Sequence, residues 1–261
     1  MKQRILTAII GLIIFIPIIW YGKLPFVIIA YLLATVALFE LIRMYFPNKI
    51  IPNMIISSLF LWIIMFPSET FSFINFTMTK LEIIVLFAVI LLIVTVITKN
   101  KFTFDHGAFL LFATLYIGFA FYFLIELRNE GLNYLLFVLF IIWATDSGAY
   151  FSGRFFGKRK LWPEISPNKT IGGAVGGVIC AFIVGVLFQI SYPFEQSFLF
   201  IIIFSVVISL VGQIGDLVAS AIKRHYEVKD FGRIFPGHGG ILDRLDSLLF
   251  VLLVLYIVQF V

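Results

Sequence analysis

The residues best suited to chemistry lie near the end of the chain, between Asp216 and Asp246. This stretch combines aspartates, basic residues and a Pro-Gly-His-Gly-Gly turn, and long apolar segments lie on both sides of it. Charge at the edge of a bilayer is costly, so this density of charged residues between apolar segments indicates a functional site. The rest of the chain is then expected to position it.

Three polar residues at the start of this stretch are spaced to share one face of a helix. Asp216, Ser220 and Lys223 stand at i, i+4 and i+7, so the face would present a carboxylate, a hydroxyl and an ammonium. Arg224 lies one position further round. The alternative reading is an acidic and basic pair that caps a helix where it leaves the membrane.

The glycine turn precedes the last apolar segment. Gly239 and Gly240 would let the backbone approach a ligand closely, and a helix N-terminus behind such a turn is suited to binding an anion. Asp243 and Asp246 follow at i and i+3 in the first turns of that helix. One acid there commonly satisfies the helix dipole, but two beside Arg244 indicate a binding site.

The aspartates and the basic residues predict a site for phosphate and metal. Mg²⁺ prefers carboxylate oxygens, water and substrate phosphates, and Asp216, Asp243 and Asp246 would supply carboxylates from two helices. The neighbouring lysines and arginines would attract phosphates. His238, in the glycine turn, would bind phosphate or transfer a proton, although a lone histidine is as often structural.

A second polar cluster lies between residues 145 and 173. Asp146 stands where an apolar segment ends, and Ser166, Lys169 and Thr170 precede the start of another. Hydroxyl and ammonium groups ahead of a helix N-terminus suit a phosphate. The plainer alternative is an N-cap loop at Thr170 with basic residues that fix membrane orientation.

The composition places both clusters in a membrane protein. The chain has 261 residues, of which 62% are hydrophobic and 13% charged, whereas a soluble domain is about 25% charged. Its mean hydropathy is +1.10. The single cysteine, Cys180, has no partner for an intrachain disulfide and makes a thiolate metal site implausible.

Apolar segments of about 20 residues cross a bilayer as helices, and nine candidates occur here. They span residues 5–21, 24–42, 50–67, 82–98, 107–125, 132–147, 171–190, 197–216 and 242–261. We expect an all-α, polytopic membrane protein with a single domain over residues 1–261. Residues 1–130 would be mainly scaffold, and residues 131–261 would carry the catalytic helices and two long loops, 146–170 and 217–241.

The distribution of basic residues predicts the orientation. With nine spans, all but three of the 19 Lys and Arg residues fall on one side, the exceptions being Lys23, Lys80 and Arg128. Basic residues in short loops collect on the cytoplasmic side. The N-terminus and the site are therefore expected in the cytoplasm, at the inner membrane, with the C-terminus outside. The net charge of +5 then follows from topology and needs no nucleic-acid partner.

The stretch from Ser220 to Asp246 resembles the signature of the bacterial phosphatidate cytidylyltransferases, also called CDP-diacylglycerol synthases. It reads S-x-x-K-R-x4-K-D-x-G-x3-P-G-H-G-G-x2-D-R-x-D. Further similarities occur at Gly215-Asp216-Leu217, at Asp146-x-x-Ala149-Tyr150-x-x-Gly153 and at Ser166-Pro-x-Lys169-Thr170. Two residues depart from the family pattern: Gly172 replaces a usual glutamate, and Phe231 replaces a frequent small serine.

The resemblance implies an enzyme of phospholipid biosynthesis that transfers CMP from CTP to phosphatidic acid, giving CDP-diacylglycerol and pyrophosphate. With the residue patterns, it assigns metal binding to Asp216, Asp243 and Asp246, and catalysis to these and to Lys223 and His238. Substrate binding falls to Asp146, Ser166, Lys169, Thr170, Ser220, Arg224, Lys229, Asp230 and Arg244. It also implies Mg²⁺ with a nearby K⁺. The expected partners are CTP, phosphatidic acid, the lipid bilayer and a second copy of the chain in a homodimer.

Two other readings compete. A CDP-alcohol phosphotransferase also uses aspartates at helix ends with a divalent metal, but its expected D-G-x-x-A-R run is absent from this sequence. A cation- or proton-coupled transporter would use intramembrane acids, but such proteins often show inverted repeats and broken helices at the midplane. The charges here collect at one face instead.

Overall fold

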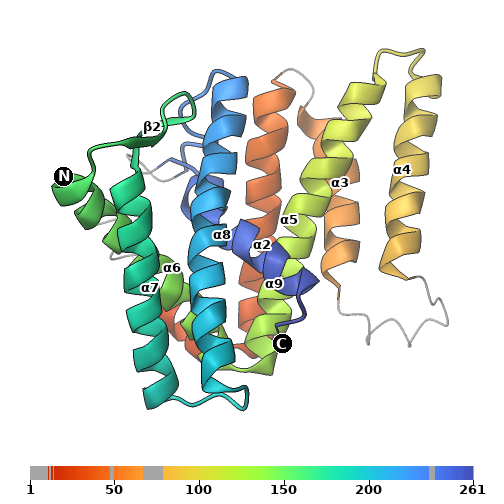
Figure 1. The fold of residues 1–261 in the computed structure, drawn as a ribbon. Helices are drawn as coiled ribbons and strands as arrows, with labels where there is room; N and C mark the ends of the chain where they lie inside the picture. The colour runs from red at the N-terminus through yellow and green to blue at the C-terminus, as the bar shows by residue number, and fades with distance from the viewer. Residues whose placement is uncertain are drawn as a thin grey trace.

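The computed structural model describes residues 11, 13, 15–47, 50–66, 79–234 and 239–260. Within these residues the chain forms a bundle of helices and one short β-hairpin (Figure 1). The elements are α2 (Lys23–Tyr45), α3 (Ile50–Met65), α4 (Lys80–Ile97), α5 (Phe104–Glu130), α6 (Leu132–Phe156), β1 (Lys160–Trp162), β2 (Ser166–Thr170), α7 (Ile171–Ser191), α8 (Phe198–His225) and α9 (Leu242–Ile257).

The predicted polytopic membrane architecture is confirmed. Among the described residues, six helices are long and apolar enough to cross a membrane, namely α2, α4, α5, α6, α7 and α8. The shorter helix α3 is also apolar. The first predicted span, 5–21, lies partly outside the described residues, and residues 15–21 of it are helical.

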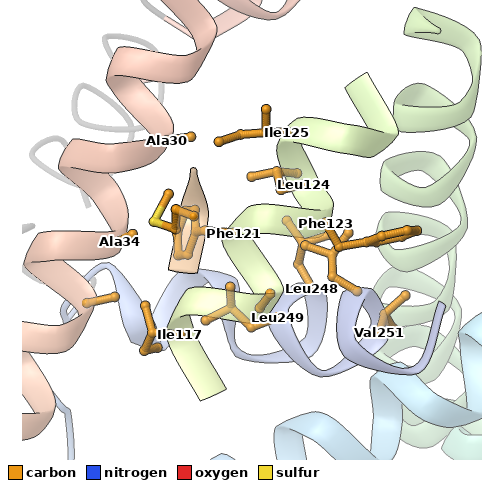
Figure 2. Packing of buried hydrophobic residues seen from close by; sticks show 14 of the residues in the cluster. Ala30, Ala34, Ile117, Phe121, Phe123, Leu124, Ile125, Leu248, Leu249 and Val251 are labelled. Carbon is orange, nitrogen blue, oxygen red and sulfur yellow. The ribbon is translucent and has the colours of Figure 1, made fainter. Parts of the chain in front are cut away.

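The last predicted span, 242–261, corresponds to the 16-residue helix α9. Its length is about 24 Å at 1.5 Å per residue, short of the ~30 Å hydrocarbon core. Figures 1 and 2 show that α9 crosses α5 at a steep angle. The count of nine spans and the positions of the termini therefore remain predictions.

Two helices extend beyond the predicted membrane spans, and both loops are shorter than expected. Helix α6 continues past residue 147 to Phe156, and α8 continues past residue 216 to His225. A charged residue ends an apolar run in the sequence, but it does not interrupt the backbone hydrogen bonds of a helix. These helices therefore extend beyond their apolar parts. Strands β1 and β2 form an antiparallel hairpin in the first loop, with Lys160 opposite Thr170, which is a small departure from an all-α fold.

Helix α5 is the centre of the packing. It contacts α2, α3, α4, α6 and α9, and Phe121, Ile117 and Ile125 on it are almost completely buried. Figure 2 shows Leu248 and Leu249 of α9 packed beside α5 in this cluster. Helix association in a membrane depends on such close packing, and here it places the start of α9 beside α8.

Small residues bring α6 and α7 together. A Cβ at Gly148 on α6 would lie 2.8 Å from the Cβ of Cys180, and one at Gly177 on α7 would lie 2.9 Å from the carbonyl oxygen of Thr145. Glycine at these positions lets the two backbones approach closely. This contact holds β2 and the N-terminus of α7 beside α6.

Candidate functional site

The predicted site lies where α8 ends, beside β2, at the upper end of the bundle in Figure 1. Gly215 on α8 permits α9 to approach, because a Cβ there would lie 2.6 Å from the Cβ of Phe250 and 3.3 Å from the carbonyl oxygen of Asp246. The next residue, Asp216, consequently lies near enough to Asp246 for their charges to repel. Carboxylates from two helices therefore lie within electrostatic range of each other here.

Asp243, in the first turn of α9, is fully engaged. One carboxylate oxygen accepts a hydrogen bond from Lys223 Nζ at 2.8 Å. The other accepts from the backbone N–H of Phe231 at 2.8 Å and from that of Gly240 at 2.9 Å. The side chain of Asp243 is only 4% exposed. It therefore ties α8, the following loop and the start of α9 together through charge-assisted hydrogen bonds.

Asp216 is paired with the second polar cluster. Its carboxylate lies 2.6 Å from Lys169 Nζ, at the end of β2, and Lys169 also donates to the carbonyl oxygen of Gln213 at 3.2 Å. Asp146 on α6 lies within electrostatic range of both Asp216 and Lys169. The two clusters that the sequence separates thus form one charged site between α6, β2, α8 and α9.

The predicted metal ligands fit a divalent cation in part. Among the described residues, no group of three His, Cys, Asp or Glu side chains is arranged to hold a metal ion. Asp216 nevertheless lies within electrostatic range of the two carboxylates of Asp246 and Asp146, and it repels both. That excess of negative oxygen atoms suits a hard cation such as Mg²⁺. Asp243 already accepts three hydrogen bonds, from Lys223 and two backbone N–H groups, and so has less acceptor capacity left for a metal.

The predicted substrate-binding residues near the hairpin are close to Lys169. Thr170 is buried and caps α7, its hydroxyl accepting from the N–H of Gly173 at 3.1 Å. Ser166 is half-buried in β2. Arg224, at the end of α8, donates through Nε to the carbonyl oxygen of Ile165 at 3.4 Å. The capping role of Thr170 is thus observed, and substrate binding by these residues remains a prediction.

The remaining predicted residues lie around this core. Ser220 is half-buried on α8 between Asp216 and Lys223, as its spacing predicts. Lys229, Asp230 and Arg244 are exposed around the loop that joins α8 to α9. His238 lies outside the described residues.

The departure at Gly172 has a structural reason. A Cβ at this position, in the first turn of α7, would lie 3.0 Å from the carbonyl oxygen of Phe156 at the end of α6. A glutamate would need the two helix ends to move slightly apart. The glycine therefore accompanies the close contact of α6 with α7.

Glu40 was not among the predicted site residues. This residue of α2 is 2% exposed, and its carboxylate accepts hydrogen bonds from the backbone N–H groups of Ile241 at 3.0 Å and Leu242 at 2.9 Å. The N–H groups expected to bind a phosphate are therefore bonded to a carboxylate of the chain itself. An ionisable residue inside the predicted span 24–42 was the available signal, because such residues are commonly functional.

A polar network extends from the site into the bundle. Gln213 Nε2 on α8 donates to the carbonyl oxygen of Ala174 at 3.3 Å and contacts Ser209 Oγ at 3.5 Å. Thr145 Oγ1 on α6 lies 2.9 Å from the same Ser209 oxygen. These bonds fix α6, α7 and α8 relative to one another directly beneath Lys169 and Asp216.

The fold and the site together define a polytopic membrane protein with a charged site, rich in carboxylates and amines, at one end of its helix bundle. The model of the Cytidylyltransferase family matches residues 2–261, and the chain belongs to this family. The predicted enzyme class, a nucleotidyltransferase, is thereby confirmed.

Relatives that are similar over almost the whole chain carry the name that the resemblance predicted. The phosphatidate cytidylyltransferase of Bacillus subtilis is 48% identical over 260 residues, which is 98% of this chain and 96% of the relative. That of Staphylococcus saprophyticus is 48% identical over 252 residues, or 97% and 96% of the two chains. The Staphylococcus aureus protein of the same name is 45% identical over 252 residues, which is 97% of this chain and 96% of the relative.

Proposed function

We propose that this protein transfers CMP from CTP to phosphatidic acid and releases pyrophosphate, which makes CDP-diacylglycerol for phospholipid synthesis. The observation that carries this proposal is the 48% identity with a phosphatidate cytidylyltransferase over 98% of the chain. The charged site supports it, because carboxylates and amines at the end of a membrane bundle suit a reaction between two phosphate compounds, one of them a lipid.

We place the active site on the cytoplasmic side of the bacterial cell membrane, with the N-terminus in the cytoplasm, nine spans and the C-terminus outside. The support is the basic residues around the site, such as Lys158, Lys169 and Arg224, which favour the cytoplasmic face. CTP is a soluble anion and would reach the site from that side. Labelling of single cysteines placed at either terminus tests this orientation, and the mass of the detergent-solubilised protein tests the expected homodimer.

In the proposed reaction, an oxygen of the phosphatidate phosphate attacks the α-phosphorus of CTP. A new oxygen–phosphorus bond forms as the bond to the β-phosphate bridging oxygen breaks, and pyrophosphate leaves. A phosphate monoester is already ionised near pH 7, so its oxygen needs little help from a base. The chain's own task is to hold two anions in line against their repulsion.

Lys169 and Lys223 carry the positive charge that this task needs inside the site, because both side chains are partly buried between helices. Arg224, Lys229 and Arg244 would supply further charge from the exposed rim. Mg²⁺ held by Asp216 and Asp246, with Asp243 as the third predicted ligand and K⁺ nearby, would neutralise the triphosphate and the leaving pyrophosphate.

Purified protein in detergent with Mg²⁺ tests the proposal. Pyrophosphate should be released from CTP only when phosphatidic acid is added. Consumption of CDP-diacylglycerol without use of CTP would instead identify a phosphotransferase. Ion flux into liposomes in the absence of CTP would identify a transporter.

A further inference from the structure

Glu40 lies far from the site in sequence but directly beneath it in space. It is on α2, in the half of the chain expected to be scaffold, and it is 2% exposed. Its two oxygens each accept one backbone hydrogen bond, Oε1 from Ile241 at 3.0 Å and Oε2 from Leu242 at 2.9 Å. Both partners immediately precede Asp243.

The surroundings of this carboxylate are shaped to receive it. A Cβ at Gly232 or at Gly240 would overlap the Glu40 carboxylate. Both glycines belong to the segment between α8 and α9, and the Glu40 carboxylate fits against them only because neither has a side chain. Glu40 therefore occupies a fitted position.

Helix α9 needs a cap that its own sequence does not provide. Ile241 stands at the N-cap position in an α-helical conformation and makes no side-chain cap hydrogen bond. The first N–H groups of a helix have no partner within it, and an acceptor of negative charge is favoured there. Glu40 supplies that acceptor from a different helix.

We infer that Glu40 is a positioning residue for catalysis, acting through the first turn of α9 on Asp243 and Asp246. The inference rests on the proposed function. Two carboxylates accept hydrogen bonds from this segment. Asp243 accepts from the N–H groups of Phe231 and Gly240, and Glu40 accepts from those of Ile241 and Leu242. Glu40 thereby fixes the rotation of α9 about its axis and its position along that axis. These two determine how Asp246 lies relative to Asp216.

A Glu40→Gln variant tests this inference with almost no change of shape. The amide keeps one acceptor oxygen, but its NH₂ group faces a backbone N–H, so one of the two bonds is lost. Residues that orient metal-binding groups typically change activity or metal affinity by about 10- to 100-fold. We expect kcat to fall by about that factor and the Mg²⁺ concentration for half-maximal activity to rise, with the KM for CTP changed less than about threefold.

Gly232→Ala provides a second variant that leaves the carboxylate chemically intact but displaces it. It should reproduce the kinetic pattern of Glu40→Gln, and the double variant should be no worse than either single one, because both act on one contact. Ser57→Ala is the matched control: Ser57 is fully buried on α3, its Oγ has no hydrogen-bond partner among the residues that the structure describes, and it is not part of the site. Its kcat and Mg²⁺ dependence should equal those of the wild type.

Three results would overturn the inference. One is a Glu40→Gln protein with wild-type kcat and Mg²⁺ dependence, even if its melting temperature falls. Another is a marked fall in the KM for CTP, which would mean that the Glu40 carboxylate competes with a phosphate of CTP for the N–H groups at the start of α9. The third is additive losses in the double variant. A wild-type protein that releases no pyrophosphate would refute the proposed function, whereas an active wild type with any of these results refutes only the role of Glu40.

Discussion

Replacing Asp243 by asparagine removes the most highly connected side chain of the site. The carboxylate accepts from Lys223 and from two backbone N–H groups, at 2.8 to 2.9 Å, and is 4% exposed. Asparagine leaves Lys223 without its counter-ion and places an NH₂ donor against a donor. Breaking a buried ion pair by removing one partner costs about 3–5 kcal/mol. Asp243→Asn should therefore lose turnover and also melt at a lower temperature.

A second substitution separates these two effects. Lys223→Met combined with Asp243→Asn removes both charges, and replacing both partners of a buried pair costs much less than replacing one. The double variant should regain most of the melting temperature lost by Asp243→Asn, yet remain inactive. Thermal unfolding in detergent and pyrophosphate release from CTP measure the two properties on the same preparation.

Turnover of CTP at the wild-type rate by folded Asp243→Asn protein would show that Asp243 has no part in the reaction. An unchanged melting temperature of the single variant would mean that the contacts of Asp243 with Lys223 and the loop do not stabilise the site.

Three further predictions concern the rest of the site. Asp216→Asn should abolish turnover while changing the melting temperature little, because its side chain is 38% exposed and partly exposed ion pairs contribute about 0–1 kcal/mol; unfolding and activity assays check both. Gly215→Val should lower the melting temperature by forcing α8 away from Phe250, at a cost of about 1–3 kcal/mol, and reduce activity by separating Asp216 from Asp246. Chelation with EDTA should stop pyrophosphate release without unfolding the protein, and added Mg²⁺ should restore it.

The sequence was sufficient for features that depend on local composition. The apolar runs at 50–67 and 171–190 locate α3 and α7 to within a few residues. The i, i+4, i+7 spacing places Asp216 and Lys223 on one face of a helix, and the structure bears this out because α8 continues through both residues to His225. The signature residues from Asp216 to Asp246 predicted the family.

The features that could not be predicted depend on contacts between distant segments. The apolar spans predicted from hydropathy end where charged residues begin, although helices α6 and α8 continue to Phe156 and His225. Spacing does not reveal that Lys169 pairs with Asp216, because they come from different elements brought together by α6 and α7. An acid inside an apolar span was a signal at Glu40, but its partners could not be predicted, since they lie 201 and 202 residues away.

Transfer of label from CTP, labelled at the α-phosphate, into a lipid-extractable product tests the central claim most directly. The assay compares purified wild type with Asp246→Asn, in detergent with Mg²⁺ and phosphatidic acid. We predict that the wild type forms labelled CDP-diacylglycerol and that the folded variant forms none. No labelled lipid from the wild type, or equal amounts from both proteins, would contradict the account.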